Sequence, residues 1–240
     1  DDGLGKGNGI LIHENGHGVF EENQILENAS FGIEVSRGGD PTVRNNTIKD
    51  CLDSGIYLHD SAVGVYEFND ISRNKTANIE VRTGADPRVR KNKIHDGLER
   101  GIYIREDGRG YFEGNEISAS IAAGVEIKKG AQPILFNNKI IRGRDSGVFV
   151  HDGGLGQLEE NEITDNTLNG VVIRTGGNPE FKKNKIFANN KDGVYCHDSG
   201  LGVFQENDIY GNFLNGVEVE GLVSNPTLRK NTIHDNMVAG

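Results

Sequence analysis

Aromatic and acidic side chains alternate every 23 residues in the middle of the sequence, at Tyr57, Glu80, Tyr103, Glu126 and Phe149. Basic side chains recur at the same spacing two residues after four of these positions, at Arg82, Arg105, Lys128 and His151. Rings beside cations and carboxylates are typical of surfaces that bind an extended peptide or a sugar polymer. The same types also suit a half-exposed β-sheet, where they form cross-strand pairs without a ligand. These nine residues are the candidate binding site, and both interpretations stay open.

Catalysis needs a general acid and a general base at one place, so a catalytic site should interrupt the repetition. The clearest interruption is segment 105–110, and Glu80, Glu126 and Arg105 around it could form a cluster like those of lyases or hydrolases. Ordinary drift of a charged surface explains this cluster equally well. No Ser/His/Asp or Cys/His triad is evident, so we predict no catalytic residues.

Two short motifs repeat along the whole chain in register. Gly-[Ile/Val]-x-[Ile/Val/Leu/Cys] recurs with its anchor at positions 9, 32, 55, 78, 101, 124, 147, 170, 193 and 216, and Asn78 is the only anchor that is not Gly. Asn-x-Ile recurs at 23, 46, 69, 92, 115, 138, 161, 184, 207 and 231, with one extra residue before the last. A fixed period of this length is typical of a solenoid.

Each repeat contains three short β-type segments separated by Gly, Asn, Asp and Ser, which favour turns. The residues one and three after the anchor are aliphatic except for Cys196, so the alternation of side chains along a strand directs them to the interior. A single repeat cannot bury such a side, but stacked repeats can. We therefore predict an all-β, single-stranded right-handed parallel β-helix of about ten coils and three parallel sheets, forming one domain over residues 1–240.

Several recurrent residues are expected to serve the backbone. The anchor Gly suits a left-handed or closely approached position, and Asn78 is the best substitute for a left-handed one. The Asn of Asn-x-Ile is expected to form a ladder of amides between coils. Pro41 and its equivalents lie in even coils where Gly18 and its equivalents lie in odd coils, so the true unit is two coils. Glu21 and Arg44 begin an alternation of charge that should stabilise the register.

Histidine precedes an acidic residue at four equivalent places: His13–Glu14, His59–Asp60, His151–Asp152 and His197–Asp198. Histidines two coils apart lie about 10 Å from each other, whereas zinc ligands lie about 2 Å from one ion. The acidic residue of each pair leads into a turn, where Asp is favoured. We therefore expect turn chemistry here, and neither a metal nor a cofactor.

Composition limits the kinds of partner. The formal net charge of −10 disfavours nucleic acid. No apolar run approaches the roughly 20 residues of a membrane span, so no membrane association is expected. Gly240 occupies the place of a next anchor, which suggests a segment of a longer array, and we expect a monomer. Cys51 and Cys196 lie more than six coils apart and must be free thiols, which favours a reducing, intracellular compartment, cytoplasm or nucleus.

Segments 178–186, 193–195 and 197–202 resemble the parallel β-helix repeats of carbohydrate-binding proteins and sugar hydrolases. Within that group, segment 225–231 (NPTLRKN) is similar to repeats in the β-helix of an F-box-only ubiquitin-ligase subunit. The resemblance extends over nearly the whole chain. It implies recognition of protein substrates for ubiquitination.

We therefore predict a non-catalytic recognition module that binds a protein or extended peptide on the outward face of the first sheet. Its aromatic residues should form exposed platforms about 10 Å apart, and Tyr103→Ala with Arg105→Ala should abolish binding without disturbing the fold. The alternative is a protein that binds an acidic glycan or modifies it as a lyase, hydrolase or epimerase. Lyases of this group usually cluster Asp for calcium beside Arg or Lys in one groove, whereas acids and bases here are spread along the chain.

Overall fold

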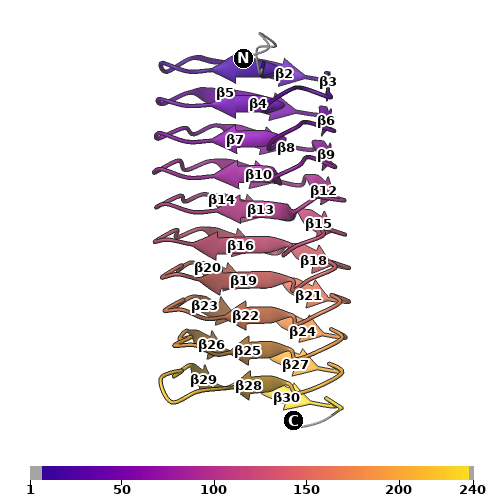
Figure 1. Cartoon of the computed structure of the whole chain (residues 1–240), viewed down its shortest axis with the longest axis vertical. Coiled ribbons are helices and arrows are strands. Elements are labelled where there is room, and N and C mark those ends of the chain that lie inside the picture. Colours follow the sequence, from indigo (N-terminus) through magenta and orange to yellow (C-terminus); the bar gives the residue numbers. More distant parts are fainter. Residues whose placement is uncertain (1–6, 238–240) are drawn as a thin grey trace, which may run out of the picture.

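The computed structural model describes residues 7–237, which form thirty β-strands and no helix. Figure 1 shows the strands stacked across the long axis, with the two ends of the chain at opposite ends of the stack. Each strand pairs in parallel with the equivalent strand of the next coil, so three ten-stranded sheets run the length of the molecule. The prediction of a parallel β-helix with three sheets is confirmed.

The three sheets take one strand each from every coil. Sheet A consists of β1 (Ile10–Ile12), β4 (Ile33–Val35), β7 (Ile56–Leu58), β10 (Ala77–Val81), β13 (Arg100–Ile104), β16 (Val125–Lys128), β19 (Val148–His151), β22 (Val171–Ile173), β25 (Val194–Cys196) and β28 (Val217–Val219). Sheet B consists of β2 (His17–Glu21), β5 (Asp40–Arg44), β8 (Val65–Glu67), β11 (Arg88–Arg90), β14 (Tyr111–Glu113), β17 (Ile134–Phe136), β20 (Gln157–Glu159), β23 (Glu180–Lys182), β26 (Val203–Gln205) and β29 (Thr227–Arg229). Sheet C consists of β3 (Gln24–Leu26), β6 (Thr47–Lys49), β9 (Asp70–Ser72), β12 (Lys93–His95), β15 (Glu116–Ser118), β18 (Lys139–Ile141), β21 (Glu162–Thr164), β24 (Lys185–Phe187), β27 (Asp208–Tyr210) and β30 (Thr232–His234).

The core is a set of aliphatic and aromatic columns inside the coils. Ile79, Ile102 and Val125 lie in register in sheet A and are fully buried. Phe112 of sheet B and Ile117 of sheet C complete the same coil from the other two sides and are also fully buried. The predicted inward face of the first sheet is therefore confirmed.

The anchor glycines are required by close approach and not by left-handed geometry. A Cβ on Gly101 would lie 2.6 Å from the carbonyl oxygen of Gly124 in the next coil, and the φ of Gly101 is not positive. Asn78 is not left-handed either, so the reason predicted for it is wrong. Its Oδ1 accepts a hydrogen bond from Asn74 Nδ2 at 3.0 Å. Gly97, the equivalent of Asn74 in the next coil, has no side chain to accept this bond, so Asn78 replaces it.

The predicted asparagine ladder is present. Asn115 donates from its backbone nitrogen and from Nδ2 to the Oδ1 of Asn138, at 2.9 and 3.0 Å. The same Nδ2 also donates to the carbonyl oxygen of Val89 at 2.9 Å. Each side chain thus ties a turn to the coils on both sides, and these amides are buried.

The two-coil unit has a steric and an electrostatic basis. A Cβ on Gly64, whose φ is +107°, would lie 2.5 Å from the carbonyl oxygen of Pro41 in the preceding coil. The position that follows Pro41 in the next coil therefore requires Gly. The predicted alternation of charge is confirmed by ion pairs such as Arg44–Glu21 at 2.9 Å in sheet B. Gly240, on which the idea of a longer array rested, lies outside the described residues.

Truncation of one core column should destabilise the coils around it. Ile102→Ala is expected to cost about 2–5 kcal/mol in the free energy of unfolding, because the neighbouring coils cannot collapse into the cavity. Denaturant unfolding measures the loss, and hydrogen exchange should rise first in the coils next to β13. Ile134→Ala, at a position that is 41% exposed on sheet B, is the control and should cost far less. A uniform rise in exchange over all coils would contradict this one-dimensional view of the core.

Candidate functional site

The outward side of sheet A carries two rows of side chains. The central row is the residue two after each anchor, and it consists of Leu11, Glu34, Tyr57, Glu80, Tyr103, Glu126, Phe149, Val172, Tyr195 and Glu218. The flanking row is two residues further on, and it consists of His13, Ser36, His59, Arg82, Arg105, Lys128, His151, Arg174, His197 and Glu220. A flanking residue contacts the central-row residue 25 positions before it, as His59 contacts Glu34.

Glu80 is a buried carboxylate held between two coils. Arg105 donates from Nε to its Oε1 at 3.0 Å, and Ser54 donates from Oγ to its Oε2 at 2.9 Å. Arg105 also pairs with Glu106, at 2.5 Å. Only 3% of Glu80 is exposed, so these partners replace the water molecules that its carboxylate loses on burial.

Glu126 repeats this arrangement two coils later with different partners. His151 Nε2 lies 3.1 Å and Lys128 Nζ lies 3.5 Å from its Oε1, and Arg100 binds its Oε2. Burial alone would raise the pKa of Glu126, but the hydrogen bonds of His151 and Arg100 and the charges of Arg100 and Lys128 together lower it to about 2. Glu126 is therefore an ionised structural group at neutral pH.

Cations of the flanking row cover the rings of the central row. The Arg82 guanidinium carbon lies 5.1 Å from the centroid of the Tyr57 ring, and Lys128 Nζ lies 5.2 Å from that of Tyr103. Such cation–π contacts stabilise both the ring and the cation. Burial raises the pKa of Tyr57 to about 12, so its hydroxyl stays protonated.

The predicted exposed aromatic platforms are wrong for two of the three rings. Tyr57 is 6% and Tyr103 is 7% exposed, because the flanking cations lie over them, while Phe149 is half-buried. The contacts of Arg105 also argue against the expectation that Tyr103→Ala with Arg105→Ala leaves the fold intact. Removal of Arg105 would leave the carboxylate of Glu80 buried without its charged partner, which is strongly destabilising.

The sequence-predicted site residues nevertheless lie together along one face. The structure places Glu80, Arg105 and Tyr103 in one contact group, and Glu126, Lys128 and His151 in the next. The guanidinium of Arg105 and the ammonium of Lys128 both lie near the ring of Tyr103, which joins the groups. The cluster proposed from Glu80, Glu126 and Arg105 is thus divided, since Arg105 pairs with Glu80 and Arg100 with Glu126.

The histidine–acid pairs are orienting contacts as well as turns. Asp60 and its equivalents adopt the left-handed conformation of a turn, with φ of 49° at Asp60. The carboxylate also contacts the preceding imidazole, with 3.0 Å between His151 Nδ1 and Asp152 Oδ2. This contact directs Nε2 to the central row. Sequence reasoning missed the pairing, although a glutamate 25 residues before His59 and His151 was a visible signal.

Within residues 7–237, no group of three or more His, Cys, Asp or Glu is placed to hold a metal ion. No helix in that part of the chain is long and apolar enough to cross a membrane. Cys51 and Cys196 are free and buried. Burial raises the pKa of the Cys196 thiol to about 12.

A hollow of about 280 Å³ opens on sheet A beyond the predicted site. Its lining residues are Asp145, Ser146, Phe149, Leu168, Asn169, Val172, Arg174, Tyr195 and His197. Of these, only Phe149 belongs to the site predicted from sequence. The missed signal is Val172, the aliphatic residue at a central-row position where other even coils carry Glu.

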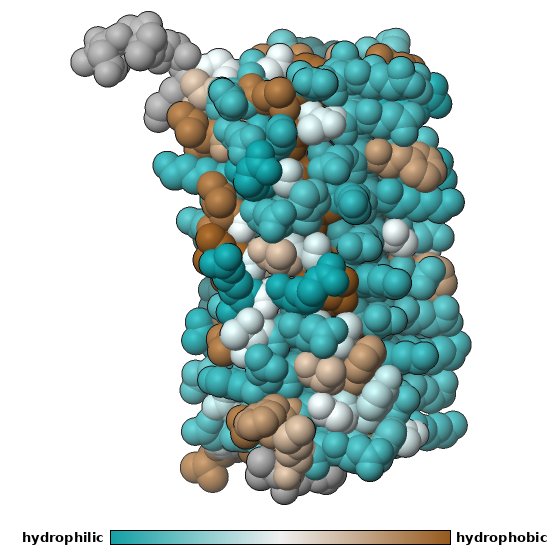
Figure 2. Space-filling model, turned by 90° about the vertical axis from the view of Figure 1, so that its right-hand side faces the viewer, coloured by the Kyte–Doolittle hydropathy of each residue, from teal (hydrophilic) through white to brown (hydrophobic). Residues whose placement is uncertain are grey.

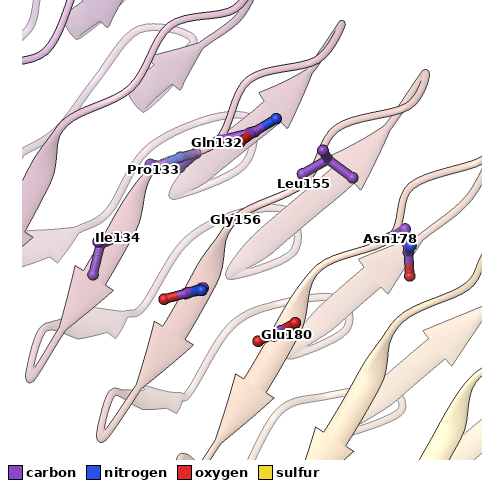
Figure 3. A pocket seen from close by; sticks show the side chains of 8 residues that line it. Gln132, Pro133, Ile134, Leu155, Gly156, Asn178 and Glu180 are labelled. Atoms are coloured by element: carbon purple, nitrogen blue, oxygen red, sulfur yellow. The ribbon is translucent and has the colours of Figure 1, made fainter.

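A second hollow, of about 420 Å³, lies on the side of sheet B. Figure 3 shows Gln132, Leu155 and Asn178 on successive coils beside it, with Ile134 and Glu180 further along the strands. Glu180 is the single charged residue in its lining, so this hollow offers amides and apolar surface but no cation. The side of the molecule on which sheet C lies is mostly hydrophilic, and its apolar residues form small separate patches (Figure 2).

Ten coils with three parallel sheets and two rows of paired side chains define the class of parallel β-helix proteins. The chain belongs to the right handed beta helix region family, whose model matches residues 4–134, 38–167 and 123–240. No curated protein matches the sequence.

Two kinds of solved structure are similar to this chain. The periplasmic alginate epimerase AlgG has a TM-score of 0.66 and 16% identity over 91% of this chain, which spans about half (50%) of the AlgG chain. The A-module of the mannuronan C-5 epimerase AlgE6 from Azotobacter vinelandii has a TM-score of 0.58 and 12% identity, covering 96% of this chain and 79% of that one. At these identities the likeness shows the fold.

Two expectations need correction. The comparisons support the β-helix family but not the likeness to an F-box ubiquitin-ligase subunit. The expectation of an intracellular compartment is contradicted, because the similar AlgG structures are of a periplasmic protein, which points away from cytoplasm and nucleus. The free thiols do not indicate the compartment, because Cys51 and Cys196 are buried and too far apart to form a disulfide with each other even under oxidising conditions.

The stabilising role of Glu126 should depend on pH. Its folded-state pKa of about 2 is below the ordinary value of 4.5, so its contribution is complete above about pH 5 and is lost as the pH falls toward 2. Glu126→Gln should therefore cost up to about 3 kcal/mol at pH 7, and the gap between variant and parent should narrow between pH 5 and 2. Urea unfolding across this range is the measurement. Glu159→Gln, in the exposed ladder, should cost about 0–1 kcal/mol. A gap that is independent of pH would refute the assignment.

Proposed function

We propose that this protein binds an acidic polysaccharide along the outward face of sheet A. The observation that carries the proposal is the line of partly exposed cations at Arg82, Arg105 and Lys128 on three successive coils, with Arg174 two coils further on, along this face. The Arg174 side chain is partly exposed and has no ion-pair partner among the described residues, while Arg82 pairs with Glu106 at 3.7 Å. Partly exposed guanidinium groups next to rings suit the carboxylates and ring faces of a uronate polymer.

The similar structures support a carbohydrate ligand more than a protein substrate. AlgG and AlgE6 are named as epimerases of alginate and of mannuronan. The buried rings also weaken the protein-recognition hypothesis, because Tyr57 and Tyr103 cannot act as anchors that enter a partner. A glycan needs only the partly exposed cations and the edge of Phe149.

A hydrolase is the least suitable of the enzymatic alternatives. Glycoside hydrolysis needs one carboxylic acid that is protonated at the working pH. Glu126, with a pKa of about 2, cannot fill this role. Hydrolysis with Glu126 as the general acid is therefore not expected.

Binding should be selective for charged polymers and sensitive to salt. We expect the parent protein to bind polygalacturonate and polymannuronate but not dextran, with affinity falling as ionic strength rises. Arg82→Gln with Arg174→Gln should weaken binding at least about tenfold, a loss of about 1.4 kcal/mol. Isothermal titration calorimetry measures both effects.

The matched control replaces two cations of another sheet. Arg44→Gln with Arg90→Gln removes the same charge from sheet B, where both side chains pair with glutamates. This variant should bind nearly as the parent does. Equal losses in the two double variants, or no binding of any acidic polymer by the parent, would overturn the proposal.

A second candidate function is epimerisation of a uronate, which the arrangement of His197 favours. Its Nδ1 lies 2.9 Å from Asp198 Oδ2, and its Nε2 has no hydrogen-bond partner among the residues that the structure describes. The Tyr195 ring stacks on the imidazole at 4.4 Å. In such a reaction a base removes the proton from the carbon next to the carboxylate, and an acid returns one to the opposite face.

Proton NMR in D₂O tests this second function directly. Turnover would introduce solvent deuterium into polymannuronate or polygalacturonate, and His197→Gln should reduce the rate at least about a hundredfold, the typical contribution of acid–base catalysis. Parent protein that binds the polymer without any deuterium uptake would exclude epimerisation and leave binding as the function.

A further inference from the structure

Three glutamates of the central row, Glu34, Glu80 and Glu126, are each gripped by two residues at fixed offsets. One gripping residue lies 26 positions earlier, directly before the anchor Gly of the preceding odd coil, and the other lies 25 positions later in the flanking row. For Glu80 these are Ser54 and Arg105. The equivalent grips are Asn8 and His59 on Glu34, and Arg100 and His151 on Glu126.

Coil eight keeps both gripping residues but lacks the carboxylate. Val172 occupies the central row, while Ser146 lies 26 positions before it and His197 lies 25 positions after it. All three line the hollow of about 280 Å³ on sheet A. Among residues 7–237 no hydrogen-bond partner is present for His197 Nε2, and the Ser146 hydroxyl is bonded to its own neighbour, Asp145, at 3.1 Å.

Coil three shows how the serine behaves when a carboxylate is present. Asp53 and Ser54 are the equivalents of Asp145 and Ser146, and the backbone nitrogen of Ser54 likewise donates to Asp53, at 3.0 Å. The Ser54 hydroxyl, however, donates to Glu80 at 2.9 Å. An acidic residue before the serine is therefore compatible with a second carboxylate in the grip.

The surroundings of the hollow add positive charge and two rings. The Arg174 guanidinium carbon lies 5.0 Å from the centroid of the Phe149 ring, and its Nε is buried without a partner in the described part of the chain. Tyr195, one coil after Val172, lines the hollow on the other side from Phe149, and its hydroxyl donates to Glu220. The charged groups at the site are thus Arg174 and, when protonated, His197, set against Asp145, Asp198 and Glu220.

We propose that this hollow binds the carboxylate of one sugar-acid residue, which takes the place of the absent glutamate side chain between Ser146 and His197. The proposal deepens the proposed function and rests on it for the class of ligand. A volume of about 280 Å³ is near the lower limit of small-molecule sites, about 300 Å³, and suits a single pyranose ring. Arg174 would supply charge to the carboxylate, and Phe149 and Tyr195 would flank the ring.

The test restores the glutamate that the repeat lacks. Val172→Glu should place a carboxylate between Ser146 and His197, where it pairs with His197 and excludes the ligand. The melting temperature should stay at or above that of the parent. The probes are D-galacturonate and its neutral methyl ester, followed by NMR of the His197 ring signals. We expect galacturonate to shift these signals, the ester to leave them unchanged, and Val172→Glu to weaken galacturonate binding at least tenfold.

The control adds the same charge elsewhere on the central row. Leu11→Glu, at a position that is 53% exposed in the first coil, should bind galacturonate as the parent does. If Val172→Glu fails to fold, His197→Gln provides the second variant and should weaken binding similarly. Undiminished galacturonate binding by a folded Val172→Glu, or equal binding of the ester, would overturn the proposal.

The outcomes separate this site from the polymer-binding function. A parent that binds galacturonate at His197 but no polymer would retain the site and remove the polysaccharide function. If the parent binds polygalacturonate and Val172→Glu binds both polymer and monosaccharide as tightly as the parent does, the function is retained and the site is removed.

Discussion

Hydrogen bonds between successive coils hold every residue over its equivalent in the next coil, and the rest of the structure depends on this register. The backbone nitrogen of Ile102 donates to the carbonyl oxygen of Gly124 at 2.9 Å, and that of Arg105 donates to Val81 at 3.0 Å. Because the register is fixed, a side chain meets the same positions of its neighbours in coil after coil. The asparagine ladder, the glycine anchors and the ion pairs of sheet B are all consequences of this one constraint.

The same register explains why the candidate site is less exposed than its position suggests. A flanking side chain extends back over the preceding coil, so Arg82 lies over Tyr57 and His59 contacts Glu34. Rings and carboxylates that point outward from a strand are then buried by the next coil. An interruption in one coil, such as Val172, opens a space that the two adjacent coils still surround.

Much of the fold followed from the sequence because the fold is periodic. The spacing of the anchors, the inward aliphatic residues and the charges of sheet B each imply one contact that repeats, and the structure contains them. The burial of Tyr57 could not be predicted from alternation along a strand, which gives direction but not what covers a side chain. The role of Asn78 depended on a gap at Gly97, which is visible only when the turns of two coils are superposed. The hollow at Val172 arises from an absent carboxylate, and a motif search detects only residues that are present.

The pairing of Pro and Gly across coils also restricts how such an array can change its length. Gly64 accommodates Pro41, and arginines of even coils pair with glutamates of odd coils in sheet B. Duplication of a single coil would place Pro beside Pro, or one glutamate beside another, at the point of insertion. Duplication of two coils preserves the alternation of Pro with Gly and of basic with acidic residues in sheet B. Arrays of this kind can therefore grow by 46 residues at a time without passing through a poorly packed intermediate length.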